Sequence, residues 1–154
     1  MMSTAVEVVA YAVLVAVGVI QSFEDIDTRR VHVLTTQVVG VGTFLTLSLA
    51  ALISSEPNGI VRMVLCAIAM WVLFFALDRA TEGGIGKGDI RLAPVIGAAT
   101  GYLSVESFAF GLLVIAVSGF AVALIALVRL GALARIPFVP VMYAAVVVSV
   151  IAHG

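Results

Sequence analysis

Long apolar runs constrain this chain more than any other feature of its sequence. A helix that spans a bilayer needs about 20 consecutive, mostly apolar residues. Five runs meet or approach that length: Thr4–Phe23, Val33–Ile53, Ile60–Leu77, Ser107–Val128 and Phe138–Ala152. Apolar residues make up 63% of the 154 residues, and a water-soluble fold of this size could not bury so much apolar surface. We therefore expect an all-α integral membrane protein with a single transmembrane domain over residues 1–154.

A further apolar run, Ile90–Leu103, is shorter than the others. Its helix would rise about 21 Å, less than the hydrocarbon core of about 30 Å. The distribution of Lys and Arg nonetheless indicates that it crosses the membrane. These residues gather in three of the polar breaks between the runs, at residues 24–32, 78–91 and 129–137. Because short loops rich in Lys and Arg remain in the cytoplasm, we expect six transmembrane helices, with both termini outside and those three loops inside.

The loop before Ile90 has the sequence GGIGKGD and ends in an aspartate, Asp89. As the N-cap of the next helix, Asp89 would simply accept hydrogen bonds from backbone N–H groups. That explanation does not require the four clustered glycines, which are Gly83, Gly84, Gly86 and Gly88. Glycine allows another chain to approach the backbone closely, so the loop suggests that an extended segment lies against it. A phosphate-binding P-loop is excluded, because Lys87 is followed by glycine and no strand precedes it.

A second aspartate, Asp25, lies at the end of the first apolar run, in the sequence EDIDTRR. Alone it fits a solvated acid at the membrane edge. Together with Asp89 on the same side of the membrane, however, it could share a proton and activate a water molecule. The chain has no basic stripe of the kind that binds phosphate backbones, so we expect no nucleic acid partner.

Three motifs in this order resemble those of the type IV prepilin peptidases, which are membrane aspartic proteases of the GxGD class. The sequence GKGD at 86–89 matches the GxGD signature. The sequence DIDTRRV at 25–31 resembles the first motif of the family, and RIPFVP at 135–140 resembles its late IPFGP element.

The chain departs from the family pattern at three places. His32 and Val33 stand where members usually carry Pro-Asn or Pro-Asp, and Val139 replaces the glycine of the late element. The paired CxxC motifs of the larger members are missing, since Cys66 is the single cysteine. The resemblance therefore points to the short form, which has peptidase activity without the methyltransferase.

The resemblance implies an aspartic endopeptidase that removes the short basic leader from type IV prepilin-like precursors at the cytoplasmic face of the cell membrane. Asp25 and Asp89 would be the catalytic pair, and no metal or cofactor would be needed. Their positions at helix ends predict the roles: the helix dipole favours an ionised Asp89 at the start of a helix and a protonated Asp25 at the end of one. The expected partners are the prepilin and the lipid bilayer. The residues expected to contact substrate are Gly86, Gly88, Glu24, Asp27 and Glu82. The three acids among them would attract the basic leader, or would simply be solvated charges.

Other functions remain open at this point. Proteases of the presenilin and signal-peptide peptidase type share GxGD but carry Tyr-Asp where this chain has Glu24-Asp25. A non-catalytic scaffold subunit of a pilus or secretion assembly would keep the topology and tolerate Asn at both aspartates. A transporter would place its ionisable groups inside the helices, and here they crowd the helix ends.

Four other residues are expected to have structural roles and no part in catalysis. Cys66 is expected to be a small buried residue. Gly97 and Gly101 form a GxxxG pattern, which predicts close packing against a neighbouring helix. Pro137 is expected at the start of the last helix, where its missing N–H costs nothing.

Overall fold

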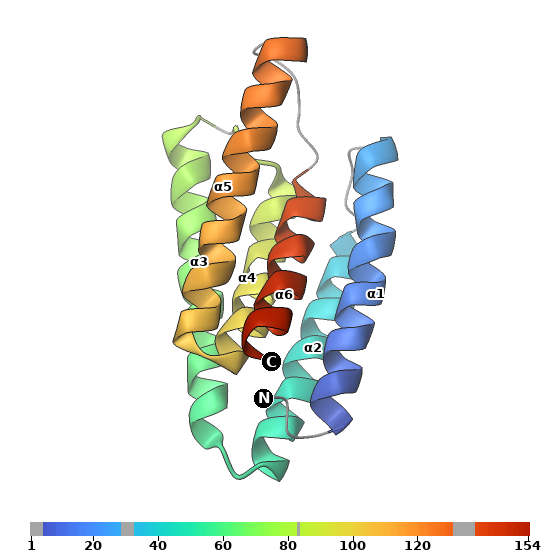
Figure 1. Ribbon diagram of the computed structural model, residues 1–154, viewed down its shortest axis with the longest axis vertical. Coiled ribbons are helices and arrows are strands. Elements are labelled where there is room, and N and C mark those ends of the chain that lie inside the picture. The colour runs from blue at the N-terminus through green and yellow to red at the C-terminus, as the bar shows by residue number, and fades with distance from the viewer. Residues whose placement is uncertain (1–4, 29–32, 83, 131–137) are drawn as a thin grey trace.

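The structure, a computed structural model, describes residues 5–28, 33–82, 84–130 and 138–154. Within these ranges the chain forms helices and no strands. The helices are α1 (Ala5–Thr28), α2 (Val33–Ile53), α3 (Pro57–Ala80), α4 (Lys87–Leu103), α5 (Val105–Leu130) and α6 (Val139–His153). All of them run roughly along the long axis of the molecule, so that they form one bundle (Figure 1). The all-α fold expected from the sequence is confirmed.

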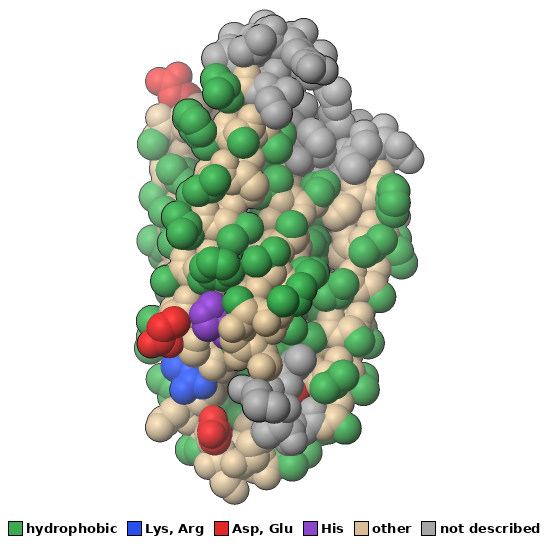
Figure 2. Space-filling view, viewed as in Figure 1, with side chains coloured by type: hydrophobic (Ala, Val, Ile, Leu, Met, Phe, Trp, Pro, Cys, Tyr) green, Lys and Arg blue, Asp and Glu red, His purple; other side chains and the backbone are tan. Residues whose placement is uncertain are grey.

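The outer surface of this bundle is apolar. Large hydrophobic side chains are exposed along the helices, for example Leu34 (76%), Phe120 (71%) and Val38 (70%). Figure 2 shows hydrophobic side chains over the middle of one face, with charged side chains towards its two ends. Four described helices, α1, α2, α3 and α5, contain segments that are long and apolar enough to cross a membrane. The chain is therefore a multi-pass membrane protein.

Helices α4 and α6 are shorter, with 17 and 15 residues. At 1.5 Å per residue they rise about 26 and 22 Å, less than the hydrocarbon core. Both nevertheless lie beside the longer helices (Figure 1). Their crossing of the membrane, and the orientation with both termini outside, stay predictions.

Most helices extend beyond the apolar runs that predicted them. Helix α1 continues past Phe23 to Thr28, and α3 begins at Pro57 instead of Ile60. Hydropathy marks the part of a helix that suits lipid, whereas the helix itself continues until a turn ends it. A proline in the first turn suits α3, because the first N–H groups of a helix have no partner within it.

Helix α4 lies at the centre of the bundle and contacts α2, α3, α5 and α6. It fits closely against α3 because two of its residues lack side chains. A Cβ added at Gly97 would lie 2.5 Å from the carbonyl oxygen of Cys66 and 2.8 Å from Cβ of Met70, and one at Gly101 would lie 2.6 Å from Sγ of Cys66. The GxxxG packing and the buried position of Cys66 are both confirmed.

Helix α1 is joined to α4 by polar side chains instead. The hydroxyl of Tyr11 donates to the carbonyl oxygen of Ala99 (2.5 Å), and the hydroxyl of Tyr102 donates to Oε1 of Glu7 (2.8 Å). Burying a polar group in an apolar interior is costly unless it is hydrogen-bonded, so these pairs belong together. Glu7, in the first turn of α1, is thus a buried ionisable residue, which the sequence analysis did not anticipate.

Candidate active site

The two motif aspartates belong to helix ends that lie at the same end of the bundle. The C-terminal ends of α1, α3 and α5 and the N-terminal ends of α2, α4 and α6 all lie towards the upper end of Figure 1. Asp25 is in the last turn of α1, and Asp89 is in the first turn of α4. The topology thus brings the two motifs, 64 positions apart in sequence, to one end of the molecule.

The backbone register of α1 assigns Asp25 to the inner face of that helix. The inner face consists of residues three or four positions apart, all of them buried: Glu7, Tyr11, Leu14, Gly18 and Gln21. With 3.6 residues per turn, the next position of this stripe is residue 25. The side chains of residues 24–28 lie outside the described part of the structure, so that the assignment is one of register.

The same register separates Asp25 from the neighbouring acids. Asp27 is two residues further along, about 200° around the helix. It shares a face with Ile20 (57% exposed) and Phe23 (65% exposed), which point away from the bundle. Glu24 belongs to the flank between the two faces. Of the three acids at this end of α1, Asp25 is the one aligned with the core.

Asp89 is the third residue of α4 and is half-buried. The alternative in which Asp89 is the N-cap of this helix is excluded, because the N-cap is Gly86, with φ −61° and ψ 133°. Lys87 and Gly88, taken from sequence as loop, belong to the first turn. One turn after Asp89, Leu92 and Ala93 are almost completely buried. Asp89 is therefore the first residue of the core-facing stripe of α4.

Gly86 lies directly beside the carboxylate of Asp89. A Cβ added at Gly86 would lie 2.7 Å from Oδ2 of Asp89, closer than a carbon and an oxygen can approach without one of them moving. Its φ and ψ suit any residue, so a larger residue here would require the carboxylate of Asp89 to move aside. On either side of Gly86 and Asp89, Ile85 and Ile90 pack against the hydrophobic core. These two contacts anchor the start of α4.

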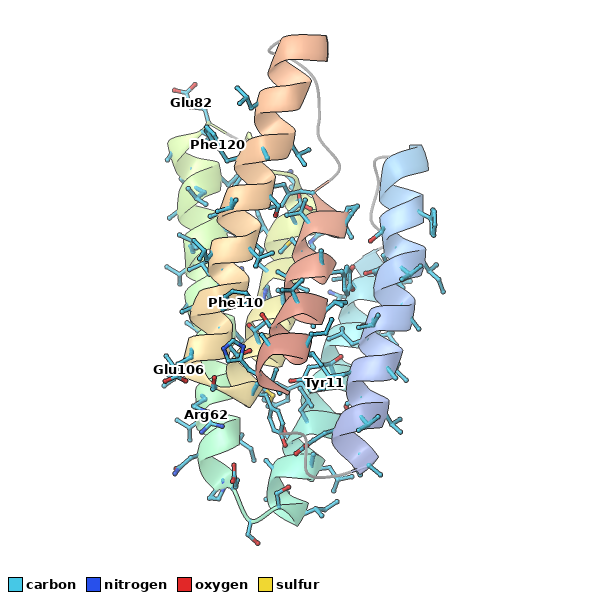
Figure 3. All side chains as sticks on the ribbon, in the orientation of Figure 1. Tyr11, Arg62, Glu82, Glu106, Phe110 and Phe120 are labelled. Carbon is cyan, nitrogen blue, oxygen red and sulfur yellow. The ribbon has the colours of Figure 1, made fainter. Side chains whose placement is uncertain are left out.

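Glu82 is not brought together with the other acids. It lies in the turn after α3, is exposed, and has φ 52°, a left-handed conformation in which glycine is more common. Figure 3 shows it projecting outwards from the α3 side of the bundle, whereas α1 forms the opposite side. Its predicted contact with substrate stays a prediction, and so do those of Glu24, Asp27, Gly86 and Gly88.

The late motif is only partly described. Residues 135–137, including Pro137, lie outside the described residues, and α6 begins at Val139 with Pro140 in its first turn. The ring of Phe138 lies edge-on to the ring of Phe74 on α3, with centroids 6.1 Å apart. This motif therefore anchors the start of α6 in the same end of the bundle.

A group of buried polar residues just below Asp25 was missed by the sequence analysis. Gln21 of α1 lies between Tyr143 of α6 and Thr36 of α2, and all three are at least 94% buried. Tyr143 and Tyr102 both join helices, through hydrogen bonds from their hydroxyls to Gln21 and Glu7 of α1. The sequence did contain a signal for this group: Gln21 is an uncharged polar residue inside an apolar run, one helical turn before Asp25.

A comparison with protein families identifies one match. The model of the type IV leader peptidase family matches residues 12–153, a range that includes both motif aspartates. Comparisons with curated proteins and with solved structures gave no match.

Proposed function

Because this chain belongs to the type IV leader peptidase family, we propose that it removes the short basic leader from type IV prepilin-like precursors. The cut would be made at the cytoplasmic face of the cell membrane, with Asp25 and Asp89 as the catalytic pair. The proposal rests on two positions at one end of the bundle. By helical register Asp25 continues the buried stripe of α1, and Asp89 lies half-buried in the first turn of α4. A prepilin is itself a membrane helix with its cleavage point at the membrane surface, where water is available.

The environment of each aspartate suggests its role. Asp89 lies at the N-terminus of α4, where the helix dipole favours a negative charge. Asp25 lies in the last turn of α1, which contains no basic residue within the helix, so there the dipole favours the protonated form. In this mechanism Asp89 accepts a proton from water as the oxygen of that water attacks the scissile carbonyl carbon. Asp25 donates its proton to the carbonyl oxygen.

The tetrahedral intermediate then collapses by cleavage of the C–N bond. The leaving nitrogen takes the proton held by Asp89, and a hydroxyl of the intermediate returns a proton to Asp25. The products are a leader with a new carboxylic acid group and a pilin with a new amino group, and the pair regains its starting state.

Glycine at position 86 is compatible with this mechanism. A methyl group there would press on the carboxylate of Asp89, so the chain leaves this acid room in its first turn. A scaffold subunit of a pilus or secretion assembly, the alternative function, would not need that space.

Leader cleavage of a co-expressed prepilin, measured as a gel shift, tests the proposal. We expect Asp25→Asn and Asp89→Asn each to lower the cleavage rate by about 10²–10⁴-fold, the usual contribution of general acid–base groups. Asp27→Asn is the matched control, because it removes the same charge from the outer face of α1 and should change KM at most. Equal amounts of each variant in the membrane must be confirmed.

The outcomes separate the alternatives. Cleavage at the wild-type rate by either Asp25→Asn or Asp89→Asn would rule out the two-aspartate mechanism. Failure of the wild type to cut any of several pilin-like precursors would favour the scaffold.

A further inference from the structure

Gln21 uses both ends of its side-chain amide to join α1 to two other helices. Its Oε1 accepts a hydrogen bond from the hydroxyl of Tyr143 on α6 (2.6 Å), and its Nε2 donates one to Oγ1 of Thr36 on α2 (3.2 Å). Gln21 is fully buried, and Thr36 and Tyr143 are 3% and 5% exposed. In an apolar interior such groups keep their partners, because losing one leaves the other unsatisfied.

The ring of Tyr143 packs directly against the backbone of α1. A Cβ added at Gly18 would lie 2.6 Å from Cε1 and from Cγ of this ring, so that only glycine leaves room for it. Gly18 is one turn before Gln21 on the same buried face. Tyr143 thus contacts α1 over two successive turns, by its ring at Gly18 and by its hydroxyl at Gln21.

We infer that Gln21, Tyr143 and Thr36 position Asp25 for catalysis, and we call them the Gln21 clamp. Asp25 is four residues after Gln21, and therefore one turn above it on the same face. Of the side chains described on α1, Gln21 is the one nearest to Asp25 that hydrogen-bonds to another helix. The clamp sets the rotation of α1 about its axis, and this rotation decides which face residue 25 occupies.

Small rotations matter because a displacement of about 1 Å can cost about 100-fold in rate. The inference rests on the proposed function, since it concerns the acid that the proposal makes catalytic. It goes further by assigning the clamp residues, which are buried within the bundle, to the positioning of that acid.

The opposite end of α1 provides a matched control. Tyr11 also donates a buried hydrogen bond between helices, to the carbonyl oxygen of Ala99 on α4 (2.5 Å), and is 3% exposed. It lies about four turns from Asp25 along the helix. Tyr143→Phe and Tyr11→Phe each delete one hydroxyl from a buried tyrosine and leave the ring in place. A purely structural role predicts the same consequence for both.

The first experiment compares the kinetics of these two variants on one prepilin. We expect Tyr143→Phe to lower kcat about tenfold with little change in KM, and Tyr11→Phe to change kcat less than twofold. Both should lose a similar amount in melting temperature. Gln21→Met removes both hydrogen bonds of the clamp and should lower kcat further. Gln21→Glu keeps the acceptor for Tyr143, so its kcat should lie between those of the wild type and Gln21→Met.

A second readout does not depend on cleavage. Cysteines introduced by Asp25→Cys and Asp89→Cys, in a Cys66→Ala background, can be joined by a short bifunctional thiol reagent. We expect Tyr143→Phe to lower the rate of this cross-linking at least threefold and Tyr11→Phe to leave it unchanged. If wild type cuts no pilin precursor while this difference is present, the proposed function fails and the clamp stands.

Three results would overturn the inference. The first is an equal loss of kcat in Tyr143→Phe and Tyr11→Phe, and the second is a wild-type kcat in both variants. The third is a fall in the melting temperature of Tyr143→Phe with kcat and cross-linking both unchanged, which would make the clamp a purely structural contact.

Discussion

The two helices that carry the aspartates are held in the bundle by different means. Helix α4, with Asp89, fits against α3 through Gly97 and Gly101, so that backbone meets backbone. Helix α1, with Asp25, is joined to its neighbours by long polar side chains. One attachment consists of two hydrogen bonds between α1 and α4, the first donated by Tyr11 of α1 and the second by Tyr102 of α4. The other attachment is the Gln21 clamp.

These two kinds of attachment predict which substitutions should displace each aspartate. Close backbone contact depends on shape, so it resists the loss of a hydrogen bond and fails when an atom is added. Attachment through hydrogen bonds fails when a donor or acceptor is removed. The position of Asp89 should therefore change most when volume is added between α3 and α4. The position of Asp25 should change most when α1 loses a hydrogen bond to another helix.

The largest effect is expected where volume is added between α3 and α4. In Gly97→Ala the new Cβ would meet the carbonyl oxygen of Cys66 at 2.5 Å, and backbone cannot move aside as a side chain can. We expect a loss of about 1–3 kcal/mol in the free energy of unfolding, measured by thermal unfolding in detergent. The control is Gly42→Ala on α2, where an added Cβ would meet no atom within 4 Å. Equal melting temperatures for the two variants would contradict the steric account.

A smaller effect, on rate alone, is expected at the start of α4. Gly86 is exposed and its backbone suits alanine, but the added Cβ would lie 2.7 Å from Oδ2 of Asp89. We expect Gly86→Ala to lower kcat about 10–100-fold by displacing that carboxylate, with an unchanged melting temperature. Gly59→Ala is the control, because its Cβ would make only ordinary contact, 3.6 Å from Tyr102. Wild-type kcat in Gly86→Ala would show that Asp89 does not need this space.

The smallest effect is expected at the surface, in the turn between α3 and α4. Glu82 is exposed and projects away from the bundle, so any attraction to a basic leader acts through water. Exposed ion pairs contribute about 0.2–1 kcal/mol, and we expect Glu82→Lys to raise KM for a basic leader no more than about fivefold. The rise should disappear at high salt, because salt screens exposed charges. An unchanged KM at low salt would remove Glu82 from substrate recognition.

The end of the bundle opposite to the aspartates shows what a structural acid looks like in this protein. Glu7 is 5% exposed and accepts a hydrogen bond from Tyr102, whose carbonyl oxygen in turn accepts one from Arg62 (3.0 Å). Figure 3 shows Tyr11 and Arg62 in this lower part of the molecule. Asp89 differs, since it is half-buried at a helix start with a glycine beside it. Burial inside the bundle suits a structural role, whereas partial exposure leaves room for water and substrate.

The helices and the two motif aspartates could be predicted from sequence because each leaves a local signal. Apolar runs mark the segments that suit lipid, and GKGD marks the start of α4. The N-cap of α4 could not be predicted, because a glycine and an aspartate both suit that position. The end of α1 was predicted one turn too early, since hydropathy reports the environment of residues and not their hydrogen bonding.

The sequence by itself therefore determined that this chain is an all-α membrane protein with two acidic motifs at helix ends. Hydropathy and short motifs suffice for that, because they depend on neighbouring residues only. The tertiary structure alone decided that Gln21 meets Tyr143, more than a hundred positions away, and that Gly18 leaves room for its ring. Such contacts depend on how distant helices pack, and helix packing is set by shape and by the pairing of buried polar groups.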